Sequence, residues 1–236
     1  TALGTNANAV GIKATAIGTN AYAGGNGSFA IGPGAQANGN NAFAIGTNAI
    51  ADGDESFAFG DGADVATDAT DALAEGDNSK ATGAYSSAYG ENSKALSNFA
   101  YAYGTDAVAM GPNAIASGTD AAASRNNAIA FGTDATSRAD EGIAIGRSAI
   151  AGTSSKAALA IGDNSFAKEE NAIAVGANSI ANGQNSYASG AAAVAKGDNI
   201  IAIGAGATAY GEETSNPLAL QAQPGSESNL NSDFLV

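Results

Sequence analysis

Glycine recurs at a fixed interval of fourteen residues along most of this 236-residue chain. Two intervals measure sixteen residues instead, so the ranges 61–76 and 147–162 each contain a two-residue insertion. A period of this length is typical of chains that stack one small unit many times rather than folding around one large core. We therefore expect about fifteen coils of fourteen residues. The glycines that define them are Gly4, Gly18, Gly32, Gly46, Gly60, Gly76, Gly90, Gly104, Gly118, Gly132, Gly146, Gly162, Gly176, Gly190 and Gly204.

The alternation within each coil predicts β-strands. Each coil divides into two heptads of the form Ala-x-Ala-x-Gly-x-x, in which alanine alternates with variable residues. An alternation of period two is the strand period, whereas a glycine every seven residues would cost a helix about 1 kcal/mol each time. We expect each heptad to form a strand of about five residues and a turn, and the chain to fold as an all-β parallel β-solenoid.

Asparagine and aspartate mark the turns. One of the two often occupies the second position after the glycine, and both residue types tolerate left-handed backbone angles and bond to their own backbone. We expect left-handed turn residues at these positions, which are Asn6, Asn20, Asn48, Asp106, Asn113, Asp120, Asp134, Asn164, Asn178 and Asn199.

The regular alanines predict a narrow interior. Ala42 and Ala44, like Ala172 and Ala174, point to one side of their strands. A coil of two short strands is flat, so only methyl groups are expected to fit inside it. Serine is the usual substitute, at Ser28, Ser56, Ser165 and Ser186.

The outward positions distinguish two kinds of strand. In the second heptad of a coil the last outward position is often polar, as in Lys80 with Thr82, so this strand is expected to face water. In the first heptad both outward positions are usually apolar, and we call this row of side chains the apolar stripe. It consists of Phe29, Ile31, Phe43, Ile45, Phe57, Phe59, Tyr101, Tyr103, Ile129, Phe131, Ile143, Ile145, Leu159, Ile161, Ile173, Val175, Ile201 and Ile203.

An apolar stripe of this extent needs a partner. Fifteen coils at about 4.7 Å each would make a rod of roughly 70 Å. Monomers rarely expose contiguous apolar patches beyond a few hundred Å², and burying each such side chain would contribute roughly 1.5–3 kcal/mol. We expect the stripe to be an oligomer interface with cyclic symmetry. Composition alone leaves two chains and three chains open.

Composition excludes several function classes. The absence of cysteine and histidine removes disulfides, thiolate chemistry and the commonest general base and metal ligand. A net charge of −14 argues against nucleic acid or an anionic membrane as a partner. No apolar run approaches the roughly 18 residues of a membrane helix, so this segment is not expected to insert into a membrane. The chain begins at Thr1 without a signal peptide and reads as an internal fragment.

The repeat resembles a known family. Asn-Ala-Ile-Ala-Val-Gly at 171–176, Asn-Ala-Phe-Ala-Ile-Gly at 41–46 and Asn-Ala-Ile-Ala-Phe-Gly at 127–132 are similar to the YadA-like head repeat of trimeric autotransporter adhesins. The resemblance covers about residues 1–211. That family's pattern, Ser-Val-Ala-Ile-Gly-x-x-Ser-x-Ala-x-Gly-x-x, is matched at Ser28, Phe29, Ala30, Ile31, Gly32, Ala35, Ala37 and Gly39.

The resemblance implies a fold, an assembly and a location. It implies a left-handed parallel β-roll, three chains around one axis and a head at the surface of a Gram-negative outer membrane, anchored through regions outside this fragment. It also implies host extracellular matrix or cell-surface ligands. Similar heads occur in some phage fibres. Residues 212–236 break the repeat, and we expect them either to cap the last coil or to connect it to a stalk.

Chemical sites are weak in this sequence. The acids of the first insertion, among them Asp61 and Asp77, suggest either a calcium site or a solvated loop, and the missing calcium-loop spacing favours the loop. Paired acids occur at Asp54/Glu55, Glu169/Glu170 and Glu212/Glu213, and we expect turn residues rather than catalytic pairs. We expect no catalytic residue, cofactor or metal.

Threonines and tyrosines raise two further alternatives. A threonine often follows the coil glycine, as in ice-binding solenoids, but a single threonine in a turn favours turn chemistry. Tyr89, Tyr101 and Tyr103 fall on the apolar strand and are expected to pack at the chain interface, while the role of Tyr85, Tyr187 and Tyr210 stays open.

The sequence as a whole predicts a non-enzymatic adhesive head of a homotrimeric surface adhesin. Two alternatives from other classes remain. One is a rigid segment of a phage or secreted trimeric fibre, and the other is an ice- or calcium-binding solenoid.

Overall fold

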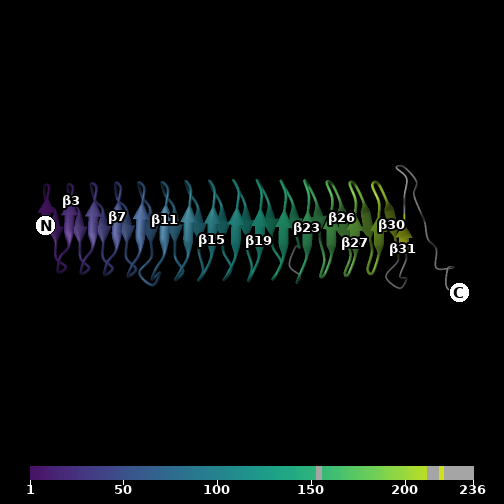
Figure 1. Ribbon diagram of the computed structural model, residues 1–236, viewed down its shortest axis with the longest axis horizontal. Coiled ribbons are helices and arrows are strands. Elements are labelled where there is room, and N and C mark those ends of the chain that lie inside the picture. The colour runs from purple at the N-terminus through teal and green to yellow at the C-terminus, as the bar shows by residue number, and fades with distance from the viewer. Residues whose placement is uncertain (153–155, 212–217, 221–236) are drawn as a thin grey trace. The chain divides into compact units, whose positions relative to one another are not determined.

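The computed structural model describes residues 1–152, 156–211 and 218–220, and the regular structure in these ranges is β-strand (Figure 1). None of the described residues belongs to a helix long and apolar enough to span a membrane. The backbone contacts divide the chain into two units, Thr1–Asp120 (unit 1) and Ala121–Val236 (unit 2). Each unit is a parallel β-solenoid, so the predicted fold class is confirmed.

Unit 1 contains two parallel sheets, one of odd-numbered and one of even-numbered strands. The odd sheet contains β1 (Ala2–Leu3), β3 (Thr15–Ile17), β5 (Phe29–Ile31), β7 (Phe43–Ile45), β9 (Phe57–Phe59), β11 (Leu73–Glu75), β13 (Ser87–Tyr89), β15 (Tyr101–Tyr103) and β17 (Ile115–Ser117). The even sheet contains β2 (Asn8–Ala9), β4 (Tyr22–Ala23), β6 (Gln36–Ala37), β8 (Ile50–Ala51), β10 (Asp64–Val65), β12 (Lys80–Ala81), β14 (Lys94–Ala95) and β16 (Val108–Ala109).

Unit 2 repeats this arrangement. Its odd sheet contains β19 (Ile129–Phe131), β21 (Ile143–Ile145), β23 (Leu159–Ile161), β25 (Ile173–Val175), β27 (Tyr187–Ser189), β29 (Ile201–Ile203) and β31 (Leu218–Leu220). Its even sheet contains β18 (Ala122–Ala123), β20 (Thr136–Ser137), β22 (Ile150–Ala151), β24 (Phe166–Ala167), β26 (Ile180–Asn182), β28 (Val194–Lys196) and β30 (Thr208–Tyr210).

The strand register follows the fourteen-residue period. Phe29 pairs with Phe43, which pairs with Phe57. Both insertions lie between strands and not within them. On the even sheet Ile50 still pairs with Asp64, fourteen residues later, whereas the next odd strand is displaced by sixteen residues and pairs Phe57 with Leu73. The first insertion therefore lies between β10 and β11. By the same test the second lies between β22 and β23, in a connection that includes residues 153–155 outside the described ranges.

The strands are shorter than predicted, at two or three residues instead of about five. The reason is that the turn takes more of each heptad. The carbonyl of Gly4 accepts a hydrogen bond from the amide of Ala7 at 3.2 Å, and Gly18 and Ala21 repeat this at 3.2 Å. Each glycine and the alanine three positions later thus belong to a turn, which leaves few residues for the sheet.

Left-handed backbone conformations occur at the predicted turn positions. Asn6 has a φ of 56°, Asn113 of 55° and Asp134 of 57°, and the other asparagines and aspartates named for this role also have positive φ. Side chains of neighbouring turns contact each other as well. The side-chain NH2 of Asn171 donates to the side-chain oxygen of Asn185 at 3.0 Å, and the side-chain NH2 of Asn185 donates to that of Asn199 at 3.1 Å. The prediction from turn chemistry is confirmed.

The glycine ladder exists because successive turns touch through their backbones. A Cβ atom added to Gly46, whose φ is 139°, would lie 2.2 Å from the carbonyl oxygen of Gly60. At Gly25 in the second heptad the corresponding distance to the oxygen of Gly39 is 1.9 Å. Both contacts are far inside van der Waals range, so a side chain at either position would push two coils apart.

Alanine and serine fill the interior, as predicted. Ala42, Ala44, Ala172 and Ala174 are fully buried, and so are the predicted serines. The expectation that only methyl groups fit is wrong at two places, where Val65 and Ile200 are buried. Val65 lies in the coil with two extra residues. Ile200 extends its Cγ1 into the space left by a glycine, since a Cβ on Gly197 would lie 3.3 Å from it.

Candidate interaction surface

The apolar stripe lies on the outer face of the odd sheets. Its residues occupy the first and last positions of odd strands, and the alanine between them points inward and is buried, as Ala30 is between Phe29 and Ile31. The stripe side chains are half-buried or exposed. Phe131 is 57% exposed and Ile203 is 40% exposed. The structure thus places the predicted interface residues together on two outward faces, one in each unit.

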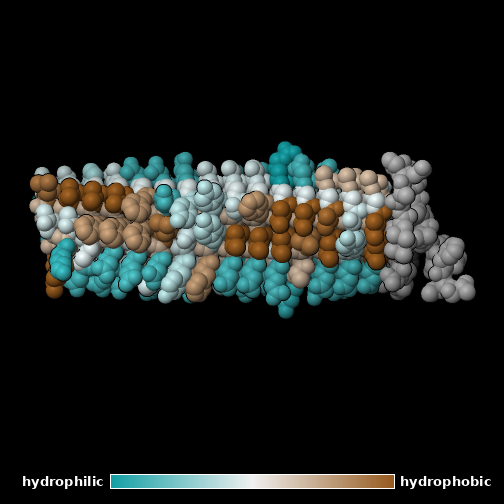
Figure 2. Space-filling view, viewed as in Figure 1, coloured by the Kyte–Doolittle hydropathy of each residue, from teal (hydrophilic) through white to brown (hydrophobic). Residues whose placement is uncertain are grey.

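In unit 1 the outer face begins with stacked aromatic rings. The rings of Phe29 and Phe43 are 4.9 Å apart at 5°, and those of Phe43 and Phe57 are 5.1 Å apart at 7°. The parallel register brings these rings together because each phenylalanine occupies the same place in its coil. Ile31 and Ile45 form a second column beside them. Figure 2 shows this surface as a brown and tan band at the N-terminal end of unit 1.

Farther along unit 1 the outer face becomes polar. Glu75 pairs with Tyr89, and Tyr89 pairs with Tyr103. The ring of Tyr89 lies 5.9 Å from those of Tyr101 and Tyr103. Burial, Tyr101 and Glu75 all raise the pKa of the Tyr89 phenol above its ordinary value, because each disfavours the phenolate. The predicted placement of these three tyrosines on the apolar strand is confirmed.

In unit 2 the outer face is mostly aliphatic. One column runs through Ile129, Ile143, Leu159 and Ile173, and the other runs through Phe131, Ile145, Ile161 and Val175. β27 interrupts both columns with Tyr187 and Ser189, after which β29 restores isoleucine. Tyr187, whose role the sequence left open, therefore lies on the same face as the stripe.

Sequence reasoning missed several outward residues of the odd sheets. The coil period, counted with the two extra residues of the first insertion, is the signal that would have identified them. These residues are Leu3, Ile17 and Leu73.

Tyr85 and Tyr210, whose roles the sequence also left open, do not lie on the outer faces of the odd sheets. Tyr85 stacks on Phe99 at 5.2 Å in turns that follow even strands, where both residues have a φ of 57° and are more than half exposed. Tyr210 ends β30 on the even sheet and is exposed.

The acids of the first insertion do not converge. Asp64 lies in β10 and forms an ion pair with Lys80 of the next coil. Asp61 accepts a hydrogen bond from the amide of Thr47 at 2.8 Å, and Glu75 is exposed at the end of β11 on the outer face of the odd sheet. Asp68 and Asp71 are exposed. Within the described ranges no three acidic side chains are grouped so as to hold a metal ion.

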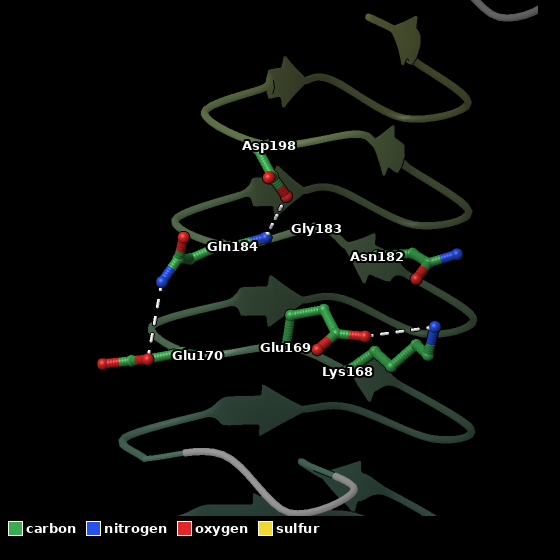
Figure 3. Close-up of a pocket in the computed structure, with 7 residues that line it drawn as sticks. All are labelled: Lys168, Glu169, Glu170, Asn182, Gly183, Gln184 and Asp198. Atoms are coloured by element: carbon green, nitrogen blue, oxygen red, sulfur yellow. Dashed lines mark hydrogen bonds and ion pairs between the residues drawn. The ribbon is translucent and has the colours of Figure 1, made fainter. Parts of the chain in front are cut away.

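Polar side chains line a shallow groove at one edge of unit 2. It has a volume of about 490 Å³ and is lined by Lys168, Glu169, Glu170, Asn182, Gly183, Gln184 and Asp198. Figure 3 shows that these residues come from three successive coils. Asp198 accepts from the amide of Gln184 at 2.7 Å, and Lys168 pairs with Glu169 at 3.1 Å.

The paired acids behave as turn residues. Asp54 accepts a hydrogen bond from the amide of Asn40 at 2.7 Å, while its neighbour Glu55 has a left-handed φ of 57°. Glu212 and Glu213 lie outside the described residues.

A further charged contact, between Arg147 and Asp163 at 2.6 Å, joins two turns, and the hydrogen bond from the guanidinium lowers the pKa of Asp163. These carboxylates serve to link coils.

The threonines that follow coil glycines stand singly in exposed turns. Thr105, Thr119 and Thr133 occupy this place in three consecutive coils, but Glu91 occupies it one coil before them and Arg147 one coil after them. The column is therefore interrupted by charged residues.

One family model matches the chain. It is described as the YadA head domain repeat, and it matches residues 1–21, 9–35, 23–49, 37–63, 68–100, 102–124, 123–149, 152–179 and 181–207. No curated protein matches the chain.

Proposed function

Because the chain belongs to the family of YadA head domain repeats, we propose that it is the adhesive head of a homotrimeric surface adhesin. The family is a structural adhesin family whose heads are exposed on the outer membrane, which supports this location and a non-enzymatic role for the chain. The observation that carries the proposal is the family match, repeated in register over nearly the whole chain.

The outer faces of the odd sheets support self-association. Their described outward positions carry a single charged side chain, Glu75, although the chain has a net charge of −14. Depletion of charge is the compositional mark of an interface core. Two negatively charged chains therefore repel each other least when they meet on these faces.

Three copies around one axis would cover both faces. Cyclic symmetry presents the same face of every copy to the axis, so the apolar stripe of each chain packs against those of the other two. The apolar stripe is therefore the proposed trimer interface, and the even sheets and the turns face outward. Three equivalent ligand-binding surfaces then act together, which raises the strength of attachment without stronger single contacts.

The ligand is proposed to be a host extracellular matrix or cell-surface component. It would bind on the outward surfaces, which include the polar groove near Gln184. Because this surface is acidic and polar, the proposal includes neither nucleic acid nor a membrane as a partner.

Light scattering tests the assembly. The native chain is expected to have the mass of three chains, and Ile145→Asp or Ile173→Asp to reduce it to one, because each would place a carboxylate in the apolar interface. The control is Lys94→Asp, which changes an exposed even-sheet residue and is expected to leave the trimer intact. A monomeric native chain would refute the trimer, and equal behaviour of all variants would refute the interface.

Binding assays test adhesion. The trimer is expected to attach to surfaces coated with matrix proteins, glycans or intact cells, and the monomeric Ile173→Asp chain to attach far more weakly because avidity is lost. A trimer that attaches to none of these surfaces would instead indicate a rigid fibre segment.

A further inference from the structure

Two aromatic side chains interrupt the row of turns that follows the even strands of unit 1. Tyr85 lies in the turn after β12, and Phe99 lies at the same position one coil later, after β14. We call them the aromatic pair, and they are 55% and 57% exposed. The other coils of unit 1 carry smaller or charged residues at this position, which are Lys13, Gly27, Asn41, Glu55, Asp71 and Asn113.

The backbone of the aromatic pair is unfavourable for large side chains. Both residues have a φ of 57°, in the left-handed region that asparagine and aspartate tolerate better than bulky residues do. Of the described residues other than glycine that have a positive φ, these two are the only aromatic ones. Folding alone favours neither their conformation nor their exposure. Residues that depart from local preference in this way are found mainly at functional sites.

The coils are held together here without the rings. The amide of Tyr85 donates to the carbonyl of Thr70 at 2.9 Å, and that of Phe99 donates to the carbonyl of Ala84 at 3.0 Å. The side-chain oxygen of Asn98 also accepts from the amide of Ala84 at 3.0 Å. The same turn-to-turn bond continues at Asn113, which has no ring. Joining the coils therefore does not explain why aromatic residues occupy this position.

One face of the Tyr85 ring is available to a ligand. The two rings are parallel within 3° and their centroids are 5.2 Å apart, so each covers one face of the other. Because Phe99 belongs to the following coil, the second face of Tyr85 is directed toward the preceding coil. There the same turn position is occupied by Asp71, whose side chain is shorter than the ring. The face of an aromatic ring and a carboxylate both attract a cation.

Exposed acids extend from the aromatic pair along the same edge. Asp71 and Glu55 occupy this turn position in the two preceding coils, and Asp68 lies in the longer turn of the first insertion. Within the described ranges none of these three carboxylates forms an ion pair. The only base of unit 1 at this turn position is Lys13, three coils before Glu55. The edge therefore combines a free ring face with carboxylates that lack a cation.

We propose, resting on the outward-facing turns of the head proposed above, that this edge binds arginine side chains of an extended basic protein segment. One guanidinium stacks on the free face of Tyr85 and pairs with Asp71, and a second pairs with Glu55. Side chains on one face of an extended segment recur about every 6.6 Å, so two arginines reach carboxylates of adjacent coils about 4.7 Å apart.

Charge and shape both select arginine for this site. A chain with a net charge of −14 favours a basic partner, and the acids beside the aromatic pair focus this preference. The guanidinium is planar and weakly hydrated, so it stacks on a ring while it pairs with a carboxylate. The ammonium of lysine is a strongly hydrated point charge and gains less from the ring.

Peptide binding tests the site on the full chain. The probe is the labelled peptide Gly-Arg-Gly-Arg-Gly, followed by fluorescence anisotropy, with matched peptides that carry lysine or leucine in place of arginine. The arginine peptide is expected to bind more tightly than the lysine peptide by about threefold or more, and the leucine peptide to bind far more weakly than either.

The decisive variant combines Tyr85→Asn and Phe99→Asn. Asparagine occupies this position at Asn41 and Asn113 with a left-handed φ, so the fold accepts it. The variant is expected to bind the arginine peptide about fivefold more weakly, because the ring contribution is lost, while its melting temperature stays the same or rises. Asp71→Asn is expected to weaken binding as well. The control is Asp106→Asn, which changes the net charge equally in a turn at the opposite edge and is expected to keep the native affinity.

Four results would overturn the site. They are tightest binding of the leucine peptide, unchanged affinity in the double variant, a double variant that melts well below the native chain, and equal losses from Asp71→Asn and Asp106→Asn. Light scattering adds a fifth, a native particle larger than three chains that the double variant reduces to three, because arginines of another copy would then occupy the edge. A native chain that binds the peptide but attaches to no coated surface or cell would contradict the adhesive head and leave the site standing.

Discussion

In unit 1 the outer face of the odd sheet presents phenylalanine, tyrosine and Glu75 beside isoleucine and leucine, whereas in unit 2 it presents mainly isoleucine, leucine and valine. The interiors of the two units are nonetheless alike, since Ala44 in unit 1 and Ala174 in unit 2 are both fully buried. The interior is constrained by the width of the coil, which is the same everywhere. The outer face is constrained only by what packs on it, so a difference there indicates a difference in role.

The two faces should differ in how they respond to substitution. Unit 2 offers a mostly aliphatic surface, which Tyr187 and Ser189 of β27 interrupt. Unit 1 combines the stacked rings of Phe29, Phe43 and Phe57 with polar groups that tolerate only some neighbours. The four predictions that follow test this division, beginning with the largest expected effect.

Charge placed on the two faces should have unequal consequences. Ile161→Asp in unit 2 is expected to dissociate the trimer, because an uncompensated buried charge costs about 3–5 kcal/mol. Tyr103→Asp in unit 1 is expected to weaken it less, since Tyr89 and Tyr101 can donate to the new carboxylate. Light scattering over a dilution series measures both. Equal dissociation of the two variants would remove the distinction between the faces.

Enlarging the interior should affect the two units equally. Ala44→Leu and Ala174→Leu are each expected to lower the free energy of unfolding by about 1–3 kcal/mol or more, because extra methylenes overpack a filled coil. Denaturant unfolding followed by circular dichroism measures the change. Outer-face controls, Ile45→Leu and Val175→Leu, should change stability much less. A tolerated leucine in one unit alone would show that the interiors differ.

The aromatic stack should stabilise unit 1 modestly. Phe43→Leu removes the ring between Phe29 and Phe57 and is expected to cost about 0.5–1.5 kcal/mol beyond the lost area, the usual value of an aromatic pair. The matched change in unit 2 is Ile143→Leu, which has no ring to lose. Thermal unfolding compares them, and equal melting temperatures would mean that stacking contributes nothing beyond area.

The smallest effect concerns the protonation of Tyr89. Its pKa is raised above the ordinary value of 10.0, first by burial and then by Tyr101 and Glu75. Because the folded pKa is the higher one, the associated stabilisation is present below the pKa of the unfolded chain and is lost as pH rises through the folded value. Ultraviolet titration should show one late phenolate, and Tyr89→Phe should remove it. Persistence of the late step in that variant would assign it to another tyrosine.

Much of the fold could be predicted from spacing, and the reason is local. Gly46 needs a positive φ and close backbone contact, Asn6 and Asn113 need left-handed turns, and alternate positions must be small. Each requirement depends on a few neighbouring residues and recurs in every coil. The parallel register, the insertions, the alanine interior and the outward stripe could therefore be predicted from the order of residues alone.

Only the tertiary structure decided which side chains meet across coils. Residues fourteen or sixteen positions apart become neighbours through the sheet, which is why Asp64 pairs with Lys80 rather than joining the acids beside it in sequence. The same stacking brought Glu75 into line with Tyr89 and Tyr103. The sequence determined the unit that repeats, because the turn and the narrow coil are local. The structure decided the chemistry of the surface, because that depends on what each repeat places above the last.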